Sequence, residues 1–188
     1  MARINSGFAV WLTGLPSSGK SVIAQELKRL LSEKGISIQI LDSDELRCHL
    51  TPYPTFTDKE RKWFYEMVAF LAGLLTENGV NVLIAATGSR REYRDNARSG
   101  IGRFAEVHIH CPKVVCRERD PKGLWQKAEK GEIHSLPGVG IQYEAPLSPE
   151  IKVDSSIMTI KEAAKHIFEG LFQIGFIDPQ LRIPVKSA

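Results

Sequence analysis

The chain has 188 residues, of which 43% are hydrophobic and 25% charged, and this fits one globular domain with its own hydrophobic core. The formal net charge of +3 is too small to indicate a nucleic-acid partner, and small anionic substrates suit it equally well. No apolar stretch approaches the roughly 20 residues of a membrane span, and residues 1–7 lead into a predicted strand rather than a signal peptide, so we expect a cytoplasmic protein without membrane contact.

The first predicted strand, residues 8–13, leads into a glycine-rich loop and then into a helix over 22–33. The loop matches the pattern G-x-x-x-x-G-K-[ST] with Gly14, Leu15, Pro16, Ser17, Ser18, Gly19, Lys20 and Ser21. In this strand–loop–helix context, backbone N–H groups wrap a phosphate and the helix dipole adds to the attraction. The motif therefore predicts ATP binding, with Lys20 at the β- and γ-phosphates and the Ser21 hydroxyl on Mg²⁺.

Beyond the loop, short β-branched segments alternate with helical patterns. The predicted strands span 37–42, 80–86, 104–110 and 151–154, and the predicted helices span 58–78, 90–98 and 159–172. Such alternation indicates an α/β fold, a doubly wound and mostly parallel five-stranded sheet with helices on both faces. Together with the phosphate loop, this is the fold expected of a P-loop kinase. We expect residues 1–174 to form this domain and 175–188 to form a C-terminal tail.

One long segment, residues 121–149, lies between the fourth and the fifth predicted strand. It is rich in Lys, Gly and Pro, too polar for core and too long for a simple connection. We therefore expect it to be a mobile lid over the site.

Acidic residues follow the second strand, where the ligands of open parallel sheets gather. Asp42, Asp44 and Glu45 lie within four positions of one another, and carboxylates so close raise one another's pKa unless a metal or an arginine compensates. This favours a place beside Mg²⁺ or a role as acceptor of a hydroxyl proton. The alternative is that Asp44 only caps the following helix.

Basic residues follow the third and fourth strands. They are Arg90, Arg91 and Arg94 after the third strand, and Arg117, Arg119 and Lys122 after the fourth. Phosphoryl transfer needs positive charge at this edge, because its transition state spreads negative charge over oxygen atoms. The set favours a site for an anionic acceptor, although a solvated charged surface is the alternative for any single arginine.

Three motifs resemble those of adenylylsulfate kinases. Residues 41–47 (L-D-S-D-E-L-R) resemble the family's L-D-G-D-x-[IV]-R, residues 91–98 (R-E-Y-R-D-N-A-R) resemble its R-x-x-R-D-x-A-R, and residues 119–125 read R-D-P-K-G-L-W. Such kinases transfer the γ-phosphoryl group of ATP to the ribose 3′-hydroxyl of adenylyl sulfate, which gives 3′-phosphoadenylyl sulfate in sulfate activation. The resemblance implies this ATP- and Mg²⁺-dependent reaction here, on a small nucleotide substrate, in a homodimer.

The resemblance also implies roles for particular residues. Lys20, Asp42 and Asp44 would be catalytic, Ser21 and Asp42 would hold Mg²⁺, and Arg119 would bind ATP together with the phosphate loop. The residues implied to bind the acceptor are Asp44, Arg47, Phe56, Arg61, Arg91, Lys122 and Leu136. Phe56 matches a phenylalanine that stacks on the acceptor's adenine, and Arg47 and Arg61 would meet its phosphosulfate.

The departures from the family pattern lie on the acceptor side. Phe64 stands where the family has a substrate-contacting asparagine, Glu66 and Met67 replace two arginines, and Leu136 replaces a second aromatic residue that would sandwich the adenine. Two alternatives therefore stay open: a related kinase acting on another nucleotide-like or sugar-phosphate hydroxyl, and a regulatory module that binds ATP without catalysis. The carboxylate cluster argues against the second, because binding alone would not need it.

Overall fold

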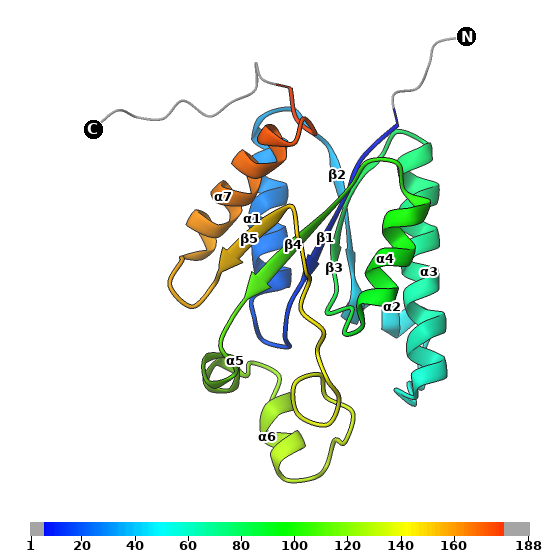
Figure 1. Cartoon of the computed structure of the whole chain (residues 1–188), viewed down its shortest axis with the longest axis vertical. Coiled ribbons are helices and arrows are strands. Elements are labelled where there is room, and N and C mark those ends of the chain that lie inside the picture. The colour runs from blue at the N-terminus through cyan, green and yellow to red at the C-terminus, as the bar shows by residue number, and fades with distance from the viewer. Residues whose placement is uncertain (1–5, 179–188) are drawn as a thin grey trace.

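The computed structural model describes residues 6–178. Within that range the strands are β1 (Ala9–Thr13), β2 (Ile38–Asp42), β3 (Asn81–Ala85), β4 (Phe104–His110) and β5 (Ile151–Asp154). All neighbours pair in parallel in the order β2-β3-β1-β4-β5, so β1 is the central strand. Helices cover both faces of the sheet (Figure 1), which confirms the predicted doubly wound α/β fold.

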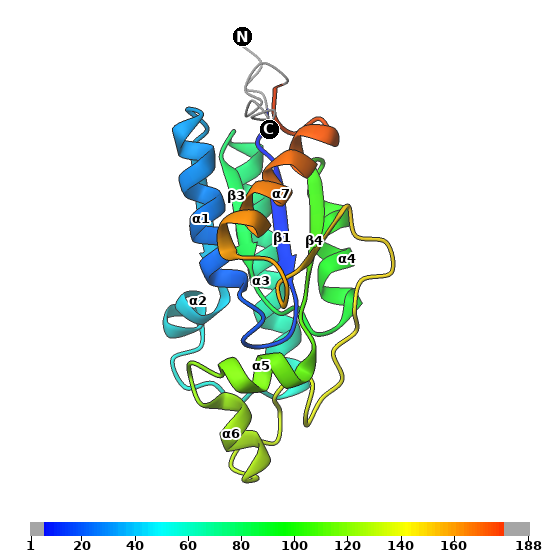
Figure 2. The ribbon, with the colours of Figure 1, turned by 90° about the vertical axis from the view of Figure 1, so that its left-hand side faces the viewer.

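The long helices form the two outer layers. On one face lie α1 (Lys20–Glu33) and α7 (Ile160–Gln173), and on the other lie α3 (Asp58–Glu77) and α4 (Arg91–Gly100). The short helices α2 (Ser43–Leu50), α5 (Lys113–Arg119) and α6 (Leu124–Glu129) lie toward the carboxyl ends of the strands, at the lower end of Figures 1 and 2. The sequence pattern missed α5 and α6 because so short a helix shows at most about two turns of periodicity, and it gave the helix expected after Asp44 no bounds.

Each face of the sheet has its own hydrophobic core, because the strands of a covered parallel sheet present apolar side chains to both sides. Val10 of β1 belongs to the core under α1 and α7, together with Leu27 and Phe168. Its neighbour Trp11 belongs to the core under α3 and α4, together with Phe64. This alternation is the period of two that a strand requires.

A third, smaller core lies beneath the phosphate loop and corrects one prediction. Trp125, Ala128 and Leu136 are buried there against Leu15 and Cys116. The Trp125 indole also donates to the carbonyl oxygen of Pro16 at 3.2 Å. The expectation that the segment 121–149 is too polar for core is therefore wrong for these residues, whose wide spacing among polar neighbours gives no periodic signal. Its action as a lid stays a prediction.

The packed domain continues past residue 174. The ring centroids of Phe176 and Phe8 are 5.3 Å apart, and Ile177 is buried. Both residues belong to the tail expected from 175 onward, whose end, 179–188, lies outside the described residues, as do residues 1–5. Between residues 6 and 178, no helix has the length and apolar character needed to cross a membrane.

Candidate active site

The phosphate loop connects β1 to α1 at the carboxyl edge of the sheet. Gly19 has a φ of 96°, a left-handed conformation that favours glycine. Gly14 has no room for a side chain, since a Cβ there would lie 2.4 Å from the carbonyl oxygen of Ile109 and 2.7 Å from Ser18 Oγ. The fold therefore requires both glycines of the motif.

The Lys20 ammonium group turns into the loop that precedes it. Nζ donates to the carbonyl oxygens of Gly14, at 3.1 Å, and Leu15, at 2.8 Å. Burial of the ammonium lowers its pKa to about 8, although the residue as a whole stays partly exposed. Ser18 Oγ is buried and has no hydrogen-bond partner within residues 6–178. An inward-turned cation and an unpaired hydroxyl fit a loop that completes its hydrogen bonds with phosphate oxygens.

The lowered pKa of Lys20 predicts how ATP binding depends on pH. A triphosphate favours the protonated amine, so binding raises the pKa again, and affinity should be full below the free-state pKa of about 8 and fall above it. We expect up to about tenfold weaker binding per pH unit above that value, measured with a fluorescent nucleotide. Lys20→Met should bind weakly without this fall, and a wild-type affinity that stays constant up to about pH 9.5 would contradict the assignment.

Two oxygen atoms suited to a divalent cation lie next to the loop. Ser21 Oγ donates to Asp42 Oδ2 at 2.6 Å, while Asp42 Oδ1 accepts the backbone N–H of Asp44 at 2.8 Å. The second contact makes Asp42 the N-cap of α2, so the alternative in which Asp44 caps this helix is wrong. A hydroxyl and a carboxylate are hard oxygen ligands, and this pair therefore fits the Mg²⁺ predicted from the sequence.

Asp44 lies in the first turn of α2, does not cap the helix, and pairs with Lys122. The Lys122 ammonium comes from the loop between α5 and α6, and both side chains are more than half exposed, at 57% for Lys122 and 62% for Asp44. The charges of Asp44, Asp42 and Lys122 all act on the Lys20 amine. Residues predicted from separate motifs thus meet around the phosphate loop.

Arg119 is linked to the phosphate loop by Ser155, which the sequence did not predict as a site residue. Its guanidinium donates to the carbonyl oxygen of Ser155 at 2.6 Å, and Ser155 Oγ donates to the carbonyl oxygen of Ser18 at 2.8 Å. Ser155 comes directly after β5, and this position at a strand's carboxyl end was the one available signal for it. A direct contact of Arg119 with ATP stays a prediction.

The residues expected to bind the acceptor divide into two groups. Arg47 and Phe56 lie together, with the Arg47 Cζ atom 5.1 Å from the centre of the Phe56 ring. Arg61 is buried instead, and two of its donors bind carbonyl oxygens, Nε that of Phe56 at 3.0 Å and Nη2 that of Ser135 at 2.6 Å. In this structure Arg61 therefore holds the Phe56 loop against the segment 121–149.

Two further residues of that prediction are also engaged with the protein. Leu136 is only 6% exposed, which leaves little of its surface for an adenine ring. The Arg91 backbone N–H donates to Glu144 Oε2 at 2.8 Å, and its guanidinium donates to the carbonyl oxygen of Ala145 at 3.3 Å. For both residues, acceptor binding stays a prediction, and their contacts here are with the chain itself.

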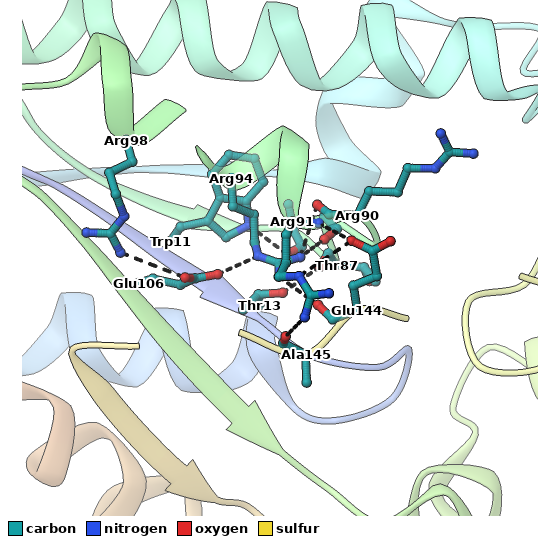
Figure 3. A network of polar contacts seen from close by, with 12 residues as sticks. Trp11, Thr13, Thr87, Arg90, Arg91, Arg94, Arg98, Glu106, Glu144 and Ala145 are labelled. Carbon is teal, nitrogen blue, oxygen red and sulfur yellow. Dashed lines mark hydrogen bonds and ion pairs between the residues drawn. The ribbon is translucent and has the colours of Figure 1, made fainter. Parts of the chain in front are cut away.

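A buried polar network lies behind the loop after β3 (Figure 3). Arg94 is 1% exposed, forms an ion pair with Glu106, and donates to the carbonyl oxygens of Gly88 and Glu144. The interpretation that Arg94 faces an anionic acceptor is therefore wrong, because a buried carboxylate already pairs with it. Glu106 was missed, since a single charged residue in an apolar strand gives no sign of its partner. The network ties the loop after β3 to Glu144, in the last part of the segment 121–149.

The backbone at position 88 favours glycine. Its φ is 51°, and a Cβ would lie 3.0 Å from the Trp11 ring and 3.1 Å from the Arg94 side chain. Both the backbone conformation and the tight packing therefore favour glycine here.

Comparisons with known proteins agree with this geometry. The sequence profile described as adenylylsulphate kinase matches residues 6–154. The adenylyl-sulfate kinase of Rippkaea orientalis is 40% identical over 171 residues, covering 91% of this chain and 94% of the relative. A probable adenylyl-sulfate kinase of Pyrococcus abyssi is also 40% identical, covering 91% and 98% of the two chains.

A solved structure of an APS kinase shows that the similarity extends to the fold. The APS kinase of Mycobacterium tuberculosis, in complex with AMPPNP and APS, superposes with a TM-score of 0.84 at 37% identity. The match covers 89% of this chain and 98% of the solved one. Shikimate kinase of Aquifex aeolicus, with a TM-score of 0.56 at 21% identity, shares the fold alone.

Proposed function

The chain belongs to the adenylylsulphate kinase family, and we propose that it transfers the γ-phosphoryl group of ATP to the ribose 3′-hydroxyl of adenylyl sulfate. The products are 3′-phosphoadenylyl sulfate and ADP. The observation that carries the proposal is the cluster of Lys20, the Ser21–Asp42 pair and the Asp44–Lys122 ion pair. Together they supply a phosphate-binding amine, two metal-binding oxygens and a carboxylate for the attacking hydroxyl.

On the ATP side, the loop amides and Lys20 hold the triphosphate. The amine leaves the carbonyl oxygens of Gly14 and Leu15 for the β- and γ-phosphates, where it offsets the charge of the transition state. Ser21 and Asp42 would hold Mg²⁺, which when bound neutralises charge on the phosphate oxygens. These roles rest on the 2.6 Å contact between Ser21 and Asp42 and on the hydrogen-bond donors of the phosphate loop and Lys20.

On the acceptor side, Asp44 takes the proton of the attacking hydroxyl. As the ribose oxygen bonds to the γ-phosphorus, the bond from that phosphorus to the β–γ bridging oxygen breaks, and its electron pair leaves with ADP. Lys122, which pairs with Asp44 here, is released toward the anionic groups of the acceptor when Asp44 engages the hydroxyl. Phe56 stacks on the adenine and Arg47 binds the phosphosulfate.

The role of Phe56 leads to a first test of the acceptor. Phe56 is 38% exposed, so part of its ring is open to a base. Phe56→Ala should raise the KM for adenylyl sulfate about tenfold or more, because one stacking face is worth about 1–3 kcal/mol. Steady-state kinetics should show the KM for ATP unchanged. Phe56→Tyr keeps the ring and serves as the control, and an unchanged acceptor KM in Phe56→Ala would remove the adenine from this position.

ADP release tests the reaction class separately from the acceptor. With Mg·ATP alone, the protein should release ADP slowly, and adenylyl sulfate should accelerate release with one phosphorylated product per ADP. Acceleration only by another nucleotide-like or sugar-phosphate compound would keep the kinase and replace the substrate. ATP binding without release under any acceptor would favour the regulatory module.

The proposal also includes the oligomeric state and the cellular location of the protein. The family resemblance favours a homodimer, and dependence on ATP and Mg²⁺ favours the cytoplasm. Light scattering coupled to size-exclusion chromatography tests the first, and a mass of one or of more than two chains would replace the dimer.

A further inference from the structure

Arg47 lies in a setting that fixes the plane of its guanidinium group. Nη1 donates to Glu60 Oε1 at 3.0 Å, and the side chain is 12% exposed. The Cζ atom lies 3.9 Å from the centre of the Phe64 ring, well inside the range of a cation–π contact, and 5.1 Å from that of Phe56. Two aromatic rings and one carboxylate thus surround a single cation.

One end of this guanidinium has no partner in the protein. Nη2 of Arg47 is buried, and no hydrogen-bond acceptor within residues 6–178 contacts it. A buried charged donor that is left open is costly, and it is satisfied by an acceptor that arrives with a ligand. Because Glu60 takes Nη1, the open Nη2 points to an anionic oxygen as the missing partner.

Phe64 is held rigidly, so it can fix what lies on it. Its side chain is fully buried in α3, and its ring meets that of Tyr65 edge to face, with centroids 5.3 Å apart. Tyr65 in turn stacks on Tyr93 at 4.7 Å, and its hydroxyl accepts the backbone N–H of Gly88 at 3.1 Å. The ring beneath Arg47 is therefore part of a fixed aromatic wall that reaches the loop after β3.

We propose that Phe64 is a positioning residue for the acceptor: its ring seats Arg47 so that the free guanidinium edge meets the acceptor's anionic group. The inference rests on the proposed function. It assigns a role to Phe64, which stands where the family pattern has an asparagine. A polar side chain here would compete for the guanidinium donors. An aromatic face attracts the cation and leaves those donors open.

Phe64→Leu is the direct test, because leucine keeps an apolar side chain and removes the aromatic face. We expect the KM for adenylyl sulfate to rise about tenfold, as for the loss of one desolvated cation–π contact. The KM for ATP and kcat should stay within about twofold, since Phe64 touches neither ATP nor the reacting atoms. The matched control is Phe168→Leu, the same substitution at a buried phenylalanine on the opposite face of the sheet.

A second pair of variants asks whether Phe64 acts through Arg47. In an Arg47→Ala background, Phe64→Leu should change the acceptor KM by less than about twofold, because the two residues act as one unit. An unchanged KM in Phe64→Leu, an equal rise for ATP and acceptor, the same rise in Phe168→Leu, or additive effects with Arg47→Ala would each overturn the inference. A folded wild-type protein that makes no product from adenylyl sulfate would instead overturn the proposed function, and this inference with it.

Discussion

Replacing Lys20 by alanine is expected to lower turnover by about three orders of magnitude, the loss found when a charge donor to a transition state is removed. In the structure its amine is already inside the loop, 2.8 Å from the Leu15 carbonyl oxygen, and only needs to exchange backbone oxygens for phosphate oxygens. Because Lys20 also contacts ground-state phosphates, the KM for ATP should rise as well, though less than kcat falls.

Lys165→Ala is the matched control for this experiment. It removes the same charge from an exposed position on α7, away from the loop, and should leave kcat unchanged. Circular dichroism checks that both variants fold. Near-normal turnover in a folded Lys20→Ala protein would contradict the assignment of this loop to phosphoryl transfer.

Asp44→Asn is expected to lower kcat by about two to four orders of magnitude while ATP binding survives, because the amide cannot accept the hydroxyl proton. Asp44 is exposed and does not cap α2, so the variant should fold. Asp42→Asn tests the metal site in the same way. Asparagine is as good an N-cap as aspartate, so this variant keeps the start of α2 and loses only the charge beside Ser21.

Asp95→Asn, at an exposed position of α4, is the control for both aspartate variants and should not affect turnover. If Asp44→Asn loses ATP affinity and turnover in parallel while its circular dichroism is unchanged, Asp44 acts in nucleotide binding and not in proton transfer. The Asp42→Asn variant should also need more Mg²⁺ for half-maximal rate, and an unchanged requirement would remove Asp42 from the metal.

The sequence predicted the framework well, because its signals are local or periodic. The alternation of residues 104–110 and 151–154 predicted β4 and β5 with the bounds that the structure shows. The phosphate loop was found because its chemistry needs particular residues at fixed spacing. The crowding of Asp42 and Asp44 likewise pointed to the carboxyl edge of the sheet, where both residues lie.

What the sequence left open depends on contacts between distant segments. Nothing local distinguishes Arg94, which pairs with Glu106 inside the fold, from the exposed Arg90 beside it. The division of labour between Asp42 and Asp44 depends on backbone conformation at the start of α2, because only one of them can take the cap position.

The acceptor side shows the same limit most clearly. From the sequence, Phe64 indicated only the loss of a polar contact. Its contact with Arg47 is between residues of two different helices, α2 and α3, and no local pattern predicts it. The burial of Leu136 likewise depends on packing with Trp125 and Leu15, which no pattern of spacing predicts.

Identification of the phosphorylated product tests the central claim most directly. The wild-type protein is incubated with Mg·ATP and adenylyl sulfate, and the product is analysed by mass spectrometry and by phosphorus NMR against authentic 3′-phosphoadenylyl sulfate. We expect one added phosphoryl group per ADP formed, located on the ribose 3′-oxygen, with no product from Lys20→Ala in the same time. Failure of adenylyl sulfate to accept phosphate at saturating concentration, in a protein that phosphorylates another hydroxyl compound, would contradict the account.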